Sequence, residues 1–199
     1  MSYIPHGPLG MGGAPLGNLF APVPEADAEA SLRAAWDGGI RHFDTAPHYG
    51  AGLSEHRMGH FLRARPRDAF TLSTKVGRLL APAQDVPEHD EGFVAALPFR
   101  RRFDYSAAGA RRSIEDSLQR LGLARIDVVY IHDCSEDWHG PAWRERMAEA
   151  MAGAARELTE LRRQGVIRAW GLGVNLVEPC LVALEQSEPG SNPFEDEQL

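Results

Sequence analysis

Short apolar runs alternate along the chain with segments in which apolar residues recur at helical spacing. Runs of this length, bounded by glycine or polar residues, are typical of buried strands. Their alternation with helices predicts an α/β fold with a parallel sheet and right-handed crossovers. The five predicted strands lie near residues 9–12, 40–43, 70–75, 126–131 and 169–174.

The predicted helices are marked by apolar positions three and four residues apart. This spacing is clearest in the two longest helices, each of which is followed by a glycine, Gly122 or Gly165. In the second helix Ser54 is in place to act as the N-terminal cap. We expect helices from Pro24 to Gly38 and over residues 54–63, 107–121, 143–161 and 177–185.

The connection over residues 76–105 is long for a compact domain and rich in proline, charge and aromatic side chains. Connections of this length often have a function, for example as a lid over a site. A surface excursion is an equally good interpretation. The basic run from Arg100 to Arg102 inside it is interpreted as a solvated loop, with contact to a phosphate as the alternative.

Two architectures fit five strand–helix units: a closed (β/α)8 barrel and an open doubly wound sheet. Gly10, Gly12 and Gly13 lack the third glycine of a dinucleotide-binding fingerprint, so we interpret Gly12 and Gly13 as a tight turn after the first strand. Candidate reactive groups follow several successive strands, which favours the TIM barrel. Such a barrel needs about 250 residues, so five units cannot close it.

Composition narrows the class of protein. The chain has 199 residues, 43% of them hydrophobic and 25% charged, which is typical of one folded soluble domain. Its formal charge of −7 gives no support for a nucleic-acid partner. The sequence has neither an apolar run of about 20 residues nor a signal peptide, so we expect a cytoplasmic protein without a membrane partner. Cys134 and Cys180 are expected to be free thiols.

Four ionisable side chains follow three of the predicted strands: Asp44 and Tyr49, then Lys75, then His132. A nearby ammonium lowers the pKa of a phenol, and Lys75 is the candidate ammonium for Tyr49. Asp44 can hold that lysine by an ion pair, while His132 can orient a substrate oxygen. The set suits proton transfer to or from an oxygen. It does not suit acyl transfer, because no serine or cysteine has a recognisable base nearby in sequence.

A metal site is the alternative use of these groups. Its ligands would come from His132, Asp133, Asp44, His42 and His48. Alternation along the strand leads us to expect that His42 faces away from Asp44, which weakens this alternative. We therefore predict no metal site.

Several motifs resemble the aldo/keto reductase family in order and spacing. The resemblance is carried by residues 44–50 with Ser54 and Glu55, by residues 73–75, 127–132 and 171–175. Residues 12–19 and 103–106 are similar to a narrower branch, which includes the D-threo-aldose, L-fucose and pyridoxal dehydrogenases. The match runs from about Leu9 to Pro189.

This resemblance implies a (β/α)8 barrel, a nicotinamide cofactor, NADP or NAD, and a small carbonyl, sugar or alcohol substrate. The implied catalytic residues are Asp44, Tyr49, Lys75 and His132, with Tyr49 as the general acid for reduction or the base for oxidation. The implied cofactor contacts are Asn175, Gly12 and Asp44. Val174 stands where many members carry serine, so one expected hydrogen bond to the cofactor is missing. Trp138 and Phe103 are candidates for lining the substrate pocket, and equally for core or loop packing.

The resemblance ends near residue 189, so we expect a barrel domain over residues 1–189 that is truncated at its C-terminus and a disordered polar tail over residues 190–199. Relatives place the ring that stacks on nicotinamide and most groups that hold the adenosine phosphates beyond that point. Two functions therefore compete: an oxidoreductase of this family, and a catalytically silent fragment or binding module that pairs its open sheet edges with another chain.

Overall fold

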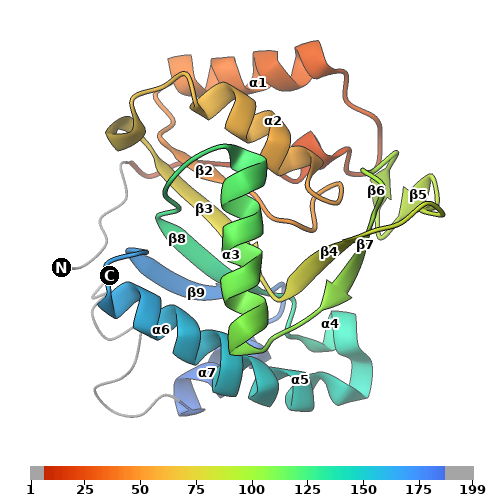
Figure 1. The fold of residues 1–199 in the computed structure, drawn as a ribbon, viewed down its shortest axis with the longest axis vertical. Coiled ribbons are helices and arrows are strands. Elements are labelled where there is room, and N and C mark those ends of the chain that lie inside the picture. Colours follow the sequence, from red (N-terminus) through yellow and green to blue (C-terminus); the bar gives the residue numbers. More distant parts are fainter. Residues whose placement is uncertain (1–6, 187–199) are drawn as a thin grey trace.

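Five parallel strands form the central sheet of the protein, in the order β1, β2, β3, β8, β9. The computed structural model describes residues 7–186, so the predicted tail at 190–199 and the domain boundary at 189 lie outside the described residues. The prediction of a parallel α/β fold with five strand–helix units is confirmed (Figure 1). The strands are β1 Gly10–Gly12, β2 His42–Asp44, β3 Thr71–Val76, β8 Val128–His132 and β9 Ala169–Gly173.

The helices follow the predicted segments closely, with short additions. The short helical turn Pro15–Gly17 lies between β1 and α1, and a second, Arg67–Ala69, lies between α2 and β3. A third, Gly140–Ala142, follows the unpredicted helix α4. The helices are α1 Glu25–Asp37, α2 Leu53–Leu62, α3 Ala107–Leu121, α4 Glu136–His139, α5 Trp143–Ala150, α6 Arg156–Arg163 and α7 Glu178–Gln186.

Helix α2 begins at Leu53, after Gly52, and its N-terminus has no side-chain cap. The prediction that Ser54 is the cap is wrong. The Ser54 hydroxyl lies 2.9 Å from Thr45 Oγ1 and donates instead to the carbonyl of Gly13 at 2.7 Å. It thereby joins the loops that follow β1 and β2, where the candidate residues lie.

The predicted helix over residues 143–161 is continuous but contains a π-helical turn, Met151–Ala155, between α5 and α6. A Cβ on Gly153 would lie 2.5 Å from the carbonyl oxygen of Tyr105, so this glycine permits close backbone contact. The amide of Ala154 donates to the same oxygen at 2.9 Å. The wider turn therefore serves the contact with the segment that leads into α3.

The core lies between the outer face of the sheet and the helices. Phe43 of β2 and Phe70, which immediately precedes β3, are buried there, and the ring of Trp36 in α1 lies 6.2 Å from Phe43 and 6.3 Å from Phe70. Phe61 of α2 joins them, 6.3 Å from Trp36. These offset and edge-to-face contacts, together with burial, fix α1 and α2 on the sheet.

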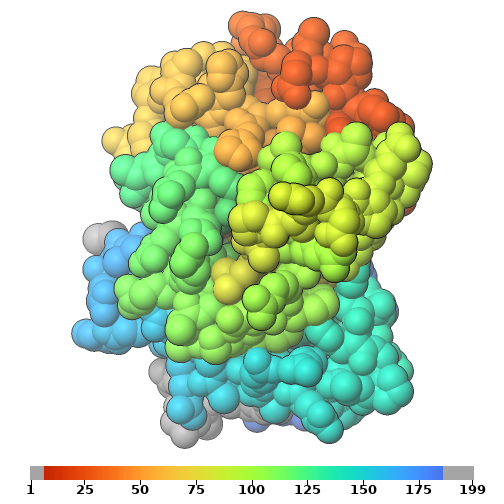
Figure 2. Space-filling view, turned by 45° about the vertical axis from the view of Figure 1, so that its right-hand side comes forward, coloured from red at the N-terminus to blue at the C-terminus, as the bar shows by residue number. Residues whose placement is uncertain are grey.

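The long connection forms two antiparallel hairpins. The larger pairs β4 Arg78–Pro82 with β7 Phe99–Phe103, and the smaller pairs β5 His89–Asp90 with β6 Phe93–Val94. Figure 2 shows this yellow-green segment on the surface of the molecule, below the orange and red N-terminal part. The amide of Val94 donates to Asn18 O, and that of Leu97 to Gly50 O, so the connection is anchored beside the loop that carries Tyr49.

The interpretation of the basic run as a solvated loop is wrong. Residues 100–102 belong to β7, and the side chain of Arg101 is only 2% exposed. Arg101 pairs with Asp90 and donates from Nε to the carbonyl of His48 at 3.0 Å. Arg100 is exposed and pairs with Asp85 at 2.6 Å. A strand can bury one member of such a run because its side chains alternate between two faces.

Cys134 is buried and Cys180 partly buried, and both are free thiols, as predicted. Over residues 7–186, no helix has the length and apolar character needed to cross a bilayer.

Candidate active site

The parallel sheet brings three of the four predicted catalytic residues to one edge. Asp44 ends β2, Lys75 lies near the end of β3, and His132 ends β8. In the strand register Asp44 is level with Ser73, and Lys75 is level with Tyr130. Since neighbouring strands run in the same direction, their carboxyl ends meet at the same edge of the sheet. Tyr49 reaches this edge from the loop after β2.

Lys75 is held by two oxygens of the β2 strand end. Its ammonium lies 2.5 Å from Asp44 Oδ2 and 2.9 Å from the carbonyl of Thr45. Burial acts to lower the pKa of Lys75, but the Asp44 carboxylate and the Tyr49 phenol outweigh it, so the pKa lies above its usual value. Lys75 is therefore a fixed positive charge at neutral pH.

Tyr49 lies next to that charge, with the Lys75 ammonium 4.7 Å from the centre of its ring. Burial raises the pKa of the Tyr49 phenol, and Lys75 lowers it less than burial raises it. The predicted direction of the Lys75 effect is therefore correct, but the net pKa is above 10 rather than below it. In this environment Tyr49 carries its proton at neutral pH.

His132 is a neutral imidazole. Burial, followed by the charges of Lys75 and Arg78, holds its pKa well below the usual value. Its ring lies 5.8 Å from that of Tyr49 at an interplanar angle of 83°. The hydroxyl of Tyr105 donates to the His132 carbonyl at 2.9 Å and fixes the end of β8. A neutral histidine held beside a protonated phenol can orient an oxygen without competing for the proton.

His42 lies on the same face of the sheet as Asp44, so the prediction that it faces away is wrong. Its Nε2 is 3.1 Å from the hydroxyl of Ser73, which also donates to Asp44 Oδ1 at 2.7 Å. Residues two apart on a strand share a face, and the apolar residue Phe43 between them turns to the core.

The metal alternative draws on groups that already have other partners: Asp44 with Lys75, and Asp133 with Arg78 at 2.7 Å. Among residues 7–186, no group of three or more histidine, cysteine, aspartate or glutamate side chains is placed to hold a metal ion.

The three predicted cofactor contacts fall at the same edge of the sheet. Gly12 ends β1 level with Asp44, and a Cβ added to it would meet nothing within 4 Å. Gly13 donates to the Asp44 carbonyl at 2.7 Å, and a Cβ there would lie 2.7 Å from that same oxygen, so the turn after β1 needs glycine. Asn175 follows β9, is exposed, and donates to Asp137 Oδ2 at 3.0 Å.

A cluster of charged residues beside the four was not predicted. Arg78, which begins β4, is 2% exposed and donates to Asp133 at 2.7 Å, to Glu91 at 2.9 Å and to His48 Nδ1 at 3.1 Å. Burial raises the pKa of Asp133 to about 6, against the opposing effect of Arg78. His48 and Asp133 are sequence neighbours of Tyr49 and His132, which is the one signal that could have suggested the cluster.

Trp138 and Phe103, the candidate pocket residues, both pack against the guanidinium of Arg78. The Arg78 Cζ atom lies 4.0 Å from the centre of the Trp138 ring and 4.4 Å from that of Phe103. Trp138 also packs edge-on to His48, with ring centres 5.3 Å apart. Both residues therefore help to hold the charged cluster, and Trp138 does so next to the predicted site.

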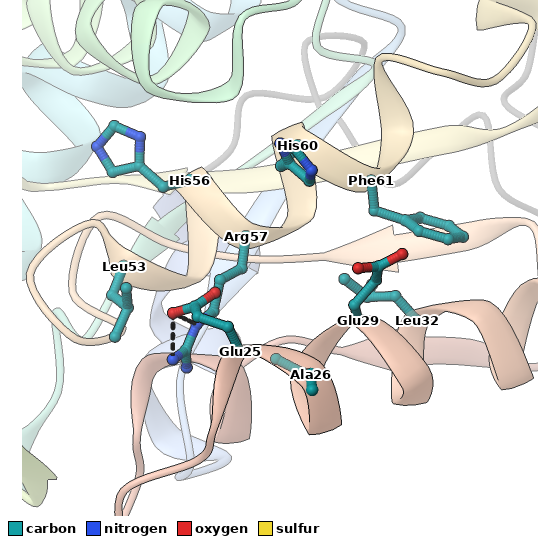
Figure 3. A pocket seen from close by; sticks show the side chains of 10 residues that line it. Glu25, Ala26, Glu29, Leu32, Leu53, His56, Arg57, His60 and Phe61 are labelled. Atoms are coloured by element: carbon teal, nitrogen blue, oxygen red, sulfur yellow. Dashed lines mark hydrogen bonds and ion pairs between the residues drawn. The ribbon is translucent and has the colours of Figure 1, made fainter.

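A cavity of about 560 Å³ lies between α1 and α2 and is lined by ten residues, none of them among the four predicted catalytic side chains. Figure 3 shows Glu25 of α1 and Arg57 of α2 across it, joined by hydrogen bonds of 2.7 and 2.9 Å. This cavity therefore lies between two helices and not at the strand ends that carry the predicted catalytic residues.

The chain is similar to known proteins in sequence and in structure. The family model described as the aldo/keto reductase family matches residues 8–185. The chain is 47% identical over 193 residues to the pyridoxal 4-dehydrogenase of Microbacterium luteolum, covering 90% of this chain and 55% of that protein. It is 42% identical over 184 residues to the D-threo-aldose 1-dehydrogenase of a Pseudomonas species, covering 90% and 54%.

A solved structure gives the same result for the fold. An aldo-keto reductase of Klebsiella pneumoniae in complex with NADPH matches with a TM-score of 0.57 and 25% sequence identity, covering 88% of this chain and 48% of that one. The chain spans about half the length of the curated relatives it matches. The described residues therefore correspond to a part of a TIM barrel.

Proposed function

Since the chain belongs to the aldo/keto reductase family, we propose that it is an NAD(P)-dependent oxidoreductase that interconverts an alcohol or sugar hemiacetal and a carbonyl or lactone. The observation that carries this proposal is the position of Tyr49 beside Lys75, which is itself bound to Asp44 at 2.5 Å. A phenol next to a fixed ammonium is suited to exchanging a proton with an oxygen.

In this proposal Tyr49 is the general acid and base. For carbonyl reduction the phenol donates its proton to the substrate oxygen, and for oxidation the phenolate accepts the hydroxyl proton. Lys75 stabilises the phenolate form of Tyr49, and Asp44 keeps Lys75 charged and in place. Neutral His132 orients the substrate oxygen. The nicotinamide, when bound, supplies or accepts the hydride.

The residues at the sheet edge fit the nicotinamide end of such a cofactor. Open space beside Gly12, next to Asp44, leaves room for a flat ring to approach the strand ends. Asn175 would hold the carboxamide after leaving Asp137, which it contacts at 3.0 Å. The NADPH complex of the Klebsiella pneumoniae relative supports NADP or NAD as the cofactor.

The proposed substrates are small and polar. The names of two similar proteins, a pyridoxal 4-dehydrogenase and a D-threo-aldose 1-dehydrogenase, support a sugar or pyridoxal. To test the proposed function, the 199-residue chain is mixed with NAD⁺ or NADP⁺ and each of these substrates. The formation of reduced nicotinamide is then followed by its absorbance. We expect turnover, and its absence with every substrate and both cofactors would overturn the proposal.

A second candidate function is a catalytically silent module that associates through its sheet. In the described residues β1 and β9 are the edges of the sheet and pair on one side only. Unpaired edge strands favour association with another chain. A cofactor titration separates the two functions: micromolar binding of NAD(H) or NADP(H) excludes the silent module, whereas self-association without cofactor binding supports it.

A further inference from the structure

His48 brings a third polar ring to the pair formed by Tyr49 and His132. The centre of its imidazole lies 6.2 Å from that of Tyr49 and 5.7 Å from that of His132. Phe93 and Trp138 pack edge-on to it at 5.0 and 5.3 Å, and His48 is only 4% exposed. Three rings at these separations can contact one small ligand at the same time.

The hydrogen bond to Arg78 defines which nitrogen of His48 carries the proton. Arg78 Nη1 lies 3.1 Å from His48 Nδ1, and a guanidinium can only donate. Glu91 Oε2 also lies 3.4 Å from Nδ1, but only the shorter contact with Arg78 has hydrogen-bond geometry. Nδ1 therefore accepts from Arg78, and the proton of the neutral ring is on Nε2. Burial and the charge of Arg78 hold the pKa of His48 at about 2, which keeps the ring neutral.

In the part of the chain that the structure describes, the Nε2 atom of His48 has no hydrogen-bond partner. The fully buried side-chain atoms without a partner do not include Nε2, so this nitrogen is not fully buried. It is thus a donor with access to ligand, next to two groups that the proposed reaction already uses.

We propose that His48 is a specificity-determining residue whose Nε2–H donates to a second oxygen of the substrate, on the carbon next to the reacting one. This inference rests on the proposed function and narrows its substrate class. The preferred substrates are α-hydroxy aldehydes and their cyclic hemiacetals, or aldehydes with a neighbouring phenol, rather than simple aldehydes and alcohols. A site that donates to a substrate hydroxyl discriminates against the analogue that lacks it.

Arg78 is a positioning residue in this account, because it acts through His48. Its guanidinium is fixed by Asp133 at 2.7 Å and Glu91 at 2.9 Å. Trp138 and Phe103 pack against it at 4.0 and 4.4 Å. The hairpin connection therefore sets the tautomer of a histidine at the site.

The first test measures the tautomer and the contact without requiring turnover. In the ¹⁵N-histidine-labelled wild-type chain, long-range ¹H–¹⁵N spectra should show His48 protonated at Nε2 and unprotonated at Nδ1 at pH 7. D-arabinose should shift the Nε2 resonance, whereas 2-deoxy-D-ribose, which is the same sugar without its 2-hydroxyl, should not. A proton on Nδ1, or equal or absent shifts with the two sugars, would overturn the proposal.

The second test uses variants that separate the two nitrogens. His48→Gln keeps a donor near the position of Nε2, whereas His48→Asn keeps a polar atom near Nδ1 only. The quantity compared is the ratio of kcat/KM for D-arabinose to kcat/KM for 2-deoxy-D-ribose. This ratio should be about tenfold higher in the wild type than in His48→Asn, and His48→Gln should lie between them. Equal preference in wild type and His48→Asn would contradict the role of His48.

The two proposals fail in different ways. Turnover of both sugars with the same preference in all three proteins contradicts only the role of His48. Absence of turnover in the wild type contradicts the proposed function, and the spectra then still decide whether His48 Nε2 contacts the 2-hydroxyl.

Discussion

The protonation states of single residues in this site are decided mainly by burial. Burial raises the pKa of Tyr49 despite the nearby Lys75, and it lowers the pKa of His48 and His132. The sequence could predict that a lysine stands near the tyrosine, but not which effect is larger. That balance depends on how much of the loop and of the hairpin connection covers the phenol.

The buried histidine at position 48 makes stability dependent on pH. Its folded pKa of about 2 lies below the unfolded value of 6.5, so the unfolded chain binds more protons between these values. Stability from this group is present above pH 6.5 and is lost as the pH falls. We expect His48 to lower the free energy of unfolding by about 2 kcal/mol at pH 5 relative to pH 7.

Urea unfolding at the two pH values checks this expectation. Asp133 acts in the opposite sense, because its raised pKa of about 6 favours the folded state as the pH falls through this range. The comparison must therefore be made with His48→Phe, which should lose about 2 kcal/mol less than the wild type between pH 7 and pH 5. An identical loss in both proteins would show that His48 is not buried in its neutral form.

The buried carboxylate of Glu55 joins three elements. Its side chain is fully buried, accepts from Thr74 of β3 at 2.8 Å, and accepts from Arg120 of α3 at 2.6 Å. Glu55→Gln removes the charge but not the volume, and leaves the Arg120 guanidinium without its counter-ion. We expect a loss of about 3 to 5 kcal/mol in the free energy of unfolding.

The matched control for this variant is Glu29→Gln. Glu29 pairs with Arg33 on the exposed face of α1, where both side chains are about half exposed. Its substitution should change the free energy of unfolding by less than about 1 kcal/mol. The two effects are measured by urea unfolding. If they were equal, burial would not determine how much the pair of Glu55 and Arg120 contributes to the free energy of unfolding.

At the scale of elements, periodicity predicted the parallel strands and the long helices because local pattern and burial agree there. The helix of residues 107–121, for example, occurs with the predicted bounds and ends at Gly122 in the left-handed region. The hairpins of residues 76–105 could not be predicted in the same way. Their strands are short, and their charged side chains are buried only because Arg78 and Arg101 find partners in distant segments.

The packing of α2 on α3 depends on one glycine that periodicity cannot identify. A Cβ on Gly59 would lie 2.2 Å from the carbonyl oxygen of Leu121 and 2.6 Å from its Cα. Gly59→Ala should therefore push the helices apart and lower the free energy of unfolding by about 1 to 3 kcal/mol, although alanine favours helix.

The next residue provides the control, because His60 is on the exposed side of the same helix. His60→Ala should leave the midpoint of thermal unfolding within a few degrees of the wild type or slightly above it. If Gly59→Ala were as stable as His60→Ala, the close contact between α2 and α3 would be wrong.

At the scale of the whole molecule, five parallel strands place the proposed proton-transfer groups at one edge of the sheet. The order of the strands and the ionisable residues that follow them were sufficient to predict this arrangement. The prediction that His42 faces away from Asp44 is wrong because the two residues are two positions apart on β2, and alternation places both opposite Phe43. The cluster around Arg78 was missed because it joins four separate segments of the chain.

The central claim is that Tyr49 transfers the proton in a nicotinamide-dependent reaction of this chain. The most direct measurement compares kcat/KM for oxidation of D-arabinose in the wild type and in Tyr49→Phe, with near-UV circular dichroism to confirm that both proteins are folded. The account predicts a loss of about 10² to 10⁴-fold in the folded variant, the range expected for a general acid–base group. Turnover that is unchanged by Tyr49→Phe would contradict it.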